Sequence, residues 1–75
     1  MSDDLLKLRH LKDRYVRECV DRVCEGARDQ AQRRALAQRA LAQPVLVFPR
    51  PPAGVGTREA YAAIMRRLVE LAGGK

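Results

Sequence analysis

The sequence predicts an all-α protein with a long amphipathic N-terminal helix, an extended proline-rich strap and a shorter C-terminal helix. Three observations lead to this prediction. Apolar residues recur every three or four positions over residues 5–27 and again over 61–72, which is the spacing of one helix face. Prolines at positions 44, 49, 51 and 52 separate these two stretches. The length of 75 residues allows a single small helical domain, residues 1–75.

The first helix is predicted over about residues 3–43. Ser2, Asp3 and Asp4 indicate its start, because a hydroxyl cap followed by two carboxylates suits the positive end of the helix dipole. One apolar stripe follows, made of Leu5, Leu8, Leu11, Tyr15, Val16, Cys19, Val20, Val23 and Ala27. Gly26 costs about 1 kcal/mol relative to alanine but does not make a turn by itself. We therefore expect the helix to continue past Gly26, bent or broken near that residue.

Residues 34–43 contain the pentapeptide RALAQ twice in tandem. Five residues correspond to about 140° of helix rotation, so the two copies point in different directions and form no heptad seam. The residues that share one side of this predicted helix are mostly small. They are Ala27, Ala31, Ala35 and Ala42, together with Gln38. We expect this side to permit close approach of another helix.

Pro44 is predicted to end the helix, because the residue before a proline avoids the α region. The apolar residues 45–48 lie between two prolines and are predicted to be extended, as a short strand or as a strap across the helices. Polyproline II geometry should follow at residues 50–52. Thr57 is the expected N-cap of the last helix, over about residues 58–72, and Gly73 and Gly74 are expected to terminate it.

The inventory of reactive side chains excludes most enzyme classes. The chain has one histidine, one serine and one threonine, whereas a hydrolytic triad or a four-ligand metal site needs several such groups together. We expect no enzymatic activity, no cofactor, no metal site and no small-molecule substrate. His10, Cys19 and Cys24 lack zinc-finger spacing, and the cysteines are expected to be small buried residues. The sequence Gly54-Val55-Gly56-Thr57 lacks the lysine of a P-loop and is interpreted as a hinge.

Leader and membrane patterns are also missing from the sequence. Two acids lead the first ten residues, and no apolar run approaches 18 residues. Two cysteines that are five residues apart cannot form a bridge within a helix, which favours reduced thiols. We expect a cytoplasmic protein that does not bind membranes, of the kind found as an accessory protein of a bacterium or its phage.

The leading hypothesis for function is a non-enzymatic protein–protein interaction protein, such as a regulator, inhibitor, chaperone or assembly factor. A straight 40-residue helix would be about 60 Å long, and the C-terminal helix covers barely a third of that length. The uncovered apolar stripe favours a homodimer, a complex with a host protein, or both. The predicted partner-binding residues are Leu8, Leu11, Tyr15, Val16, Cys19, Val20, Val23, Val45, Val47 and Phe48.

The alternative hypothesis is nucleic-acid binding. The net charge of +6 begins only after residue 27, since residues 1–27 are neutral while residues 28–50 carry +4 and residues 51–75 carry +2. Such a charge distribution attracts polyanions, although twelve of the fifteen basic residues are arginines, which also indicates a compositional preference for surface arginine. The candidate phosphate contacts are Arg28, Arg33, Arg34, Arg39, Arg66 and Arg67. With three aromatic residues, sequence-specific readout is not expected.

Overall fold

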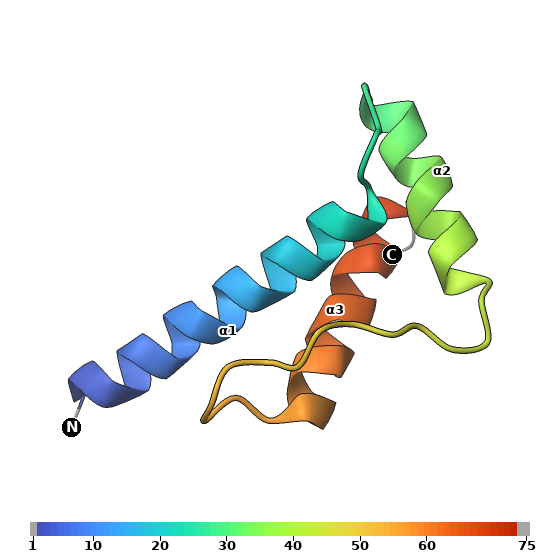
Figure 1. Ribbon diagram of the computed structural model, residues 1–75. Helices are drawn as coiled ribbons and strands as arrows, with labels where there is room; N and C mark the ends of the chain where they lie inside the picture. The colour runs from blue at the N-terminus through green and yellow to red at the C-terminus, as the bar shows by residue number, and fades with distance from the viewer. Residues whose placement is uncertain (1, 74–75) are drawn as a thin grey trace.

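The computed structural model describes residues 2–73, which form three helices (Figure 1). They are α1 (Ser2–Val23), α2 (Gln30–Leu41) and α3 (Thr57–Leu71). The all-α prediction is confirmed, and no strand occurs anywhere in residues 2–73. α3 lies between the other two helices and packs against both, whereas α1 and α2 contact each other little. The C-terminal helix is therefore the element around which the fold is organised.

The core forms where α3 meets α1 and α2. Ile64 and Leu68 of α3 are completely buried at its centre. Each is four residues from the next buried residue on the same side of α3, which is the spacing of one helix face. The other buried members of the cluster are small or β-branched, namely Val16, Cys19, Val20, Ala37 and Ala40. Because these residues bury little area each, Ile64 and Leu68 contribute most of the core's large side chains.

The predicted long helix breaks rather than bends. α1 ends at Val23, and Gly26 adopts a φ of +89°, a left-handed conformation in which L side chains are strained. The chain then starts a new helix, because the Asp29 side chain caps α2 by accepting a hydrogen bond from the backbone N–H of Gln32 at 2.9 Å. The Gln32 side chain in turn accepts from the backbone N–H of Arg28 at 2.7 Å. This reciprocal arrangement resembles a capping box.

Because the helix breaks, the predicted small-residue side of residues 27–43 is wrong. Ala31, Ala35 and Ala42 are exposed, and α2 instead buries Ala37 and Ala40 against α3. The prediction carried the helical phase of α1 through Gly26, whereas α2 starts afresh at its own cap and sets its own phase. At its far end, α2 stops at Leu41, two residues before the predicted end and ahead of Pro44.

The start of α3 also differs from the prediction in its cap. α3 begins at Thr57, one residue earlier than expected, and the N-cap position is Gly56, which makes no side-chain hydrogen bond. Thr57 is therefore the first helical residue rather than the cap. The backbone carbonyl of Gly56 still accepts the first helical hydrogen bond, from the N–H of Ala60 at 2.9 Å.

The strap, residues 44–56, runs back across the helices to the start of α3 and makes a turn at residues 53–55, where the N–H of Val55 donates to the carbonyl of Pro52 at 3.1 Å (Figure 1). Successive side chains of an extended chain point in opposite directions. Leu46 and Phe48 accordingly pack against the core, and the Phe48 ring lies 6.1 Å from the ring of Tyr61. Val45 and Val47 point outward, and Val47 is 88% exposed. Residues 45–48 form neither strand nor helix, so the short strand predicted as one alternative is not present there.

The first half of α1 extends beyond the other helices. With 22 residues α1 is about 33 Å long, whereas α3 with 15 residues is about 22 Å long. Figure 1 shows the N-terminal turns of α1 projecting past the body of the molecule. Toward that end an ion pair joins α1 to α3, in which Lys12 Nζ lies 2.9 Å from Glu59 Oε1.

This ion pair gives a prediction about titration. The hydrogen bond from Lys12, together with its positive charge, lowers the pKa of the Glu59 carboxyl. A lowered folded-state pKa stabilises the fold above the unfolded-state pKa, and the contribution is lost as the pH falls through the folded value. Replacing Lys12→Gln should return the Glu59 pKa to its ordinary value, as measured by NMR titration of the side-chain carboxyl carbon. Lys7→Gln should leave it unchanged, and an unaltered Glu59 titration in Lys12→Gln would refute the contact.

Candidate docking surface

The N-terminal half of α1 presents leucines to solvent. Leu5 is 70% exposed, Leu8 is 37% exposed and Leu11 is 40% exposed, and they occur on successive turns. Leu6 is exposed as well, on another side of the helix. They remain uncovered because α3 is shorter than α1 and does not reach these turns. Large apolar side chains exposed on consecutive turns are characteristic of a helix that packs against a further element.

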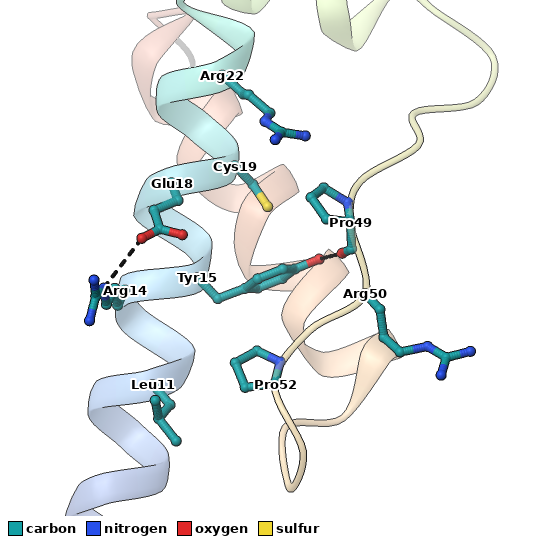
Figure 2. A pocket seen from close by; sticks show the side chains of 9 residues that line it. All are labelled: Leu11, Arg14, Tyr15, Glu18, Cys19, Arg22, Pro49, Arg50 and Pro52. Atoms are coloured by element: carbon teal, nitrogen blue, oxygen red, sulfur yellow. Dashed lines mark hydrogen bonds and ion pairs between the residues drawn. The ribbon is translucent and has the colours of Figure 1, made fainter.

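A groove of about 430 Å³ continues this surface toward the C-terminal half of α1 (Figure 2). α1 forms one wall and the strap forms the other. Figure 2 shows Leu11 and Pro52 at one end, Tyr15 reaching across toward Pro49, and Arg22 at the other end. The residues that line the groove are Leu11, Arg14, Tyr15, Glu18, Cys19, Arg22, Pro49, Arg50 and Pro52. The groove therefore combines apolar side chains with a charged rim.

Tyr15 holds the two walls together. Its phenolic hydroxyl donates a hydrogen bond to the backbone carbonyl of Pro49, 34 residues further along the chain. Burial raises the pKa of Tyr15, and the neighbouring Cys19 thiol raises it further. Burial likewise raises the pKa of Cys19, so this thiol stays protonated and behaves as a small apolar group in the groove wall.

Replacing Tyr15→Phe should lower the free energy of unfolding by about 1 kcal/mol, because the Pro49 carbonyl loses its donor while the ring is kept. Urea denaturation followed by circular dichroism measures this change. Tyr61→Phe serves as the control, since the Tyr61 hydroxyl forms no hydrogen bond among the described residues. Equal midpoints for Tyr15→Phe and the wild type would show that the strap does not depend on this bond.

The rim of the groove is mostly cationic. Arg14 and Glu18 pair with each other at 3.3 Å, whereas Arg22 and Arg50 have no ion pair within residues 2–73. Arg22 extends over one end of the groove, and Arg50 projects from the strap (Figure 2). Because Arg14 compensates Glu18, the groove keeps two uncompensated positive charges. A carboxylate on an incoming partner would complement them.

The tip of the strap packs against the same surface. Gly54 has a φ of +89°, and a Cβ built on it would lie 2.7 Å from Cδ2 of Leu8. The tip can therefore approach Leu8 this closely because residue 54 has no side chain. This contact places Gly54 beside Leu8, and Pro52 lines the neighbouring end of the groove.

The structure divides the predicted partner-binding residues into two groups. Leu8, Leu11, Val45 and Val47 are accessible on the surface. The remainder pack within the chain: Val16, Cys19 and Val20 are buried, and Tyr15, Val23 and Phe48 are partly buried against the core. Leu5, Arg14, Arg22 and Arg50 were not among the partner-binding residues predicted from the sequence. The short C-terminal helix could have indicated that Leu5 stays uncovered. The three arginines line a groove that depends on a contact between distant residues, which no local pattern reveals.

The six arginines of the nucleic-acid hypothesis do not form one surface. Arg66 and Arg67 line a cleft between α1 and α3 together with Lys12 and Arg17. Arg33 lies in the adjoining cleft, where it pairs with Asp21 at 3.6 Å. The other three are elsewhere: Arg34 lies beside Gly73, Arg39 lines a cleft near the strap, and Arg28 belongs to the linker between α1 and α2. The concentration of positive charge therefore lies between α1 and α3.

Two further features bear on the sequence predictions. Cys19 and Cys24 are free and buried, and residues 2–73 contain no group of three or more histidine, cysteine, aspartate or glutamate side chains that could hold a metal ion. In the described part of the chain, no helix has both the length and the apolar character needed to cross a membrane.

Comparisons of the chain with protein-family models, with curated protein sequences and with solved structures gave no significant match.

Proposed function

We propose that this chain is a non-enzymatic protein–protein interaction protein of the cytoplasm, acting as a small regulator, inhibitor, chaperone or assembly factor. The observation that carries the proposal is the row of exposed leucines on the projecting half of α1, continued by the groove between α1 and the strap. A leucine side chain contributes about 1.5–3 kcal/mol when it is fully removed from water. Leu8 and Leu11 are each only partly exposed, so covering both would contribute a few kcal/mol in total.

The docking surface that we propose consists of Leu5, Leu8, Leu11 and the groove, with Val45 and Val47 of the strap as a second exposed area. The buried residues Val16 and Val20 support this surface from behind, whereas Cys19, although buried, lines the groove itself. This arrangement keeps the predicted function while restricting the contact to side chains that a partner can reach.

The test uses the double variant Leu8→Ser with Leu11→Ser. A tagged wild-type chain captures its partner from an extract of its source cells, the partner is purified, and the affinity is measured by calorimetry. The double variant should bind at least about tenfold more weakly. Val69→Ser is the matched control, since Val69 is 41% exposed but lies on α3, outside the docking surface. A partner that binds the double variant as tightly as the wild type would refute the proposed surface.

A second candidate function is phosphate binding in the cleft between α1 and α3. Its lining carries four cationic side chains, Lys12, Arg17, Arg66 and Arg67, and the carboxylate of Asp13; Lys12 and Arg67 also pair with Glu59 and Glu70. Titration with duplex DNA and single-stranded RNA at two salt concentrations tests this function. Binding through four phosphates gives a log–log slope of about −3 or steeper. Arg66→Gln with Arg67→Gln should weaken binding more than Arg28→Gln with Arg39→Gln, and absence of binding at low salt would exclude the function.

A further inference from the structure

We propose that the occupant of the groove is the first half of α1 from a second copy of this chain, paired antiparallel with the first. This inference rests on the proposed function and names the partner of the same surface. By two-fold symmetry, each copy would place its own N-terminal turns against the groove of the other.

The charges of α1 support this arrangement. Asp4 and Arg22 are 18 residues apart, which is about five helical turns, so they lie on the same side of α1. Lys7 and Glu18 are 11 residues apart, about three turns, and lie on this side too. All four side chains are exposed. Antiparallel pairing about a two-fold axis near position 13 brings Asp4 of each copy to Arg22 of the other and, at the same time, Lys7 to Glu18.

The same register gives an ion-pair partner to Arg22, a charge of the groove that is unpaired within residues 2–73 of its own chain. Arg22 has no ion pair within residues 2–73 and extends over the groove (Figure 2). Asp4 likewise has no ion pair there. Each symmetric contact occurs twice, so one dimer contains two Asp4–Arg22 pairs and two Lys7–Glu18 pairs. Glu18 of each copy already pairs with Arg14 of its own chain, so the two Asp4–Arg22 pairs are the contacts in this register that join charges left unpaired within residues 2–73.

The apolar side chains agree with this register. The α1 residues that line the groove lie between positions 11 and 22. In the antiparallel arrangement, the residues opposite them are 4–15 of the other copy, and these include the exposed Leu8 and Leu11. Leu11 would lie opposite Tyr15 and Leu8 would lie opposite the Glu18–Cys19 turn. The leucines that α3 leaves uncovered thus meet the groove that the strap leaves open.

The test measures dimerisation by sedimentation or light scattering between about 10 and 500 µM, a range that suits a small interface. The wild type should approach twice the chain mass of 8.4 kDa. Asp4→Arg alone and Arg22→Asp alone should each raise the dimer dissociation constant about tenfold or more, because each reversal places like charges opposite one another twice. Arg9→Asp, a reversal on another side of α1, should have little effect.

The decisive measurement is an equimolar mixture of the two single variants. In the mixed dimer, the introduced arginine faces the introduced aspartate, and the native Asp4 of one chain faces the native Arg22 of the other. The mixture should therefore recover an affinity within about threefold of the wild type. Each substitution alone opposes the helix dipole, and mixing leaves that effect unchanged, so the recovery reports the intermolecular contact.

The outcomes separate this inference from the proposed function. A wild-type chain that stays monomeric throughout the range overturns the dimer, whereas a different protein captured through Leu8 and Leu11 would still support the proposed function. A dimer that both charge reversals leave intact, or a mixture without recovery, overturns the antiparallel pairing. A dimer that persists in the Leu8→Ser, Leu11→Ser variant overturns the pairing of these leucines with the groove of a second copy, whereas the proposed function fails only if a captured partner also binds this variant as tightly as the wild type.

Discussion

Replacing Leu68 with alanine is expected to leave most of the chain unfolded at room temperature. Leu68 is completely buried at the centre of α3, where it belongs to the cluster shared with α1 and α2. Truncating such a leucine costs about 3–5 kcal/mol, from lost burial and from the cavity that remains. A domain of this size rarely has more than about 3–5 kcal/mol of stability in total. Circular dichroism at 222 nm with thermal and urea denaturation measures the loss.

The control for this substitution is Val69→Ala on the same helix. Val69 is exposed, so its truncation should change the free energy of unfolding by less than about 0.5 kcal/mol. A substantial part of the helical signal in Leu68→Ala should disappear, because α3 packs against both other helices and neither has another extensive contact. A Leu68→Ala melting temperature within a few degrees of the wild type would mean that α3 is not the centre of the fold.

The prediction of α1 and α3 succeeded because both helices carry their fold information locally. Their apolar residues follow helical spacing, and in α3 the buried residues Ala60, Ile64 and Leu68 follow that spacing. The same pattern in α1 places Val16, Cys19 and Val20 on one apolar side; the prediction assigned them to a partner surface, whereas the structure buries them in the core. A periodic stripe identifies which side of a helix is covered, and the structure agrees with that side over the central part of α1.

The break between α1 and α2 was harder to predict, although its signals are present. Gly26 alone does not stop a helix, and the residues around it favour helix. The information that decides the matter is the Asp29–Gln32 cap, which starts a new helix with its own phase. Giving weight to an acid followed three residues later by glutamine would have placed the start of α2 correctly and avoided the error at Ala31 and Ala35.

The helical phase of α2 decides which alanines of the repeated pentapeptide RALAQ are buried. Ala35 and Ala40 occupy equivalent positions in the two copies of RALAQ, yet Ala35 is exposed and Ala40 is buried. This difference follows from the rotation of about 140° between the copies. The repeat therefore has no common structural role, as the sequence analysis expected.

The candidate site could be predicted only in part, because it depends on contacts between distant residues. Exposed leucines on α1 follow from comparing the lengths of the helices. The groove, in contrast, exists because Tyr15 contacts Pro49 and because Gly54 lets the strap tip reach Leu8. No local pattern near residue 15 refers to residues 49–54, so the pairing of Arg22 and Arg50 around one groove was not available from the sequence.

Replacing Ala37 with leucine is expected to lower the free energy of unfolding by about 1–3 kcal/mol. Ala37 is completely buried in the core cluster, and its small side chain allows α2 to approach α3. Extra methylene groups in such a packed contact force the helices apart or displace neighbouring side chains. Alanine and leucine have similar helix propensities, so the intrinsic stability of α2 is nearly unchanged. The measurement is urea denaturation, with the midpoint compared to that of the wild type.

Ala35→Leu provides a matched control, since it makes the same change two residues away on an exposed position of α2. Its midpoint should stay close to that of the wild type, because no helix covers that side. Comparing the two variants separates the effect of core packing on the free energy of unfolding from the effect of helix propensity, because both changes lie in α2 and in the repeated sequence. Equal effects at both positions, or a stabilised Ala37→Leu, would contradict the close contact between α2 and α3 and would favour the helical phase that the sequence alone suggests.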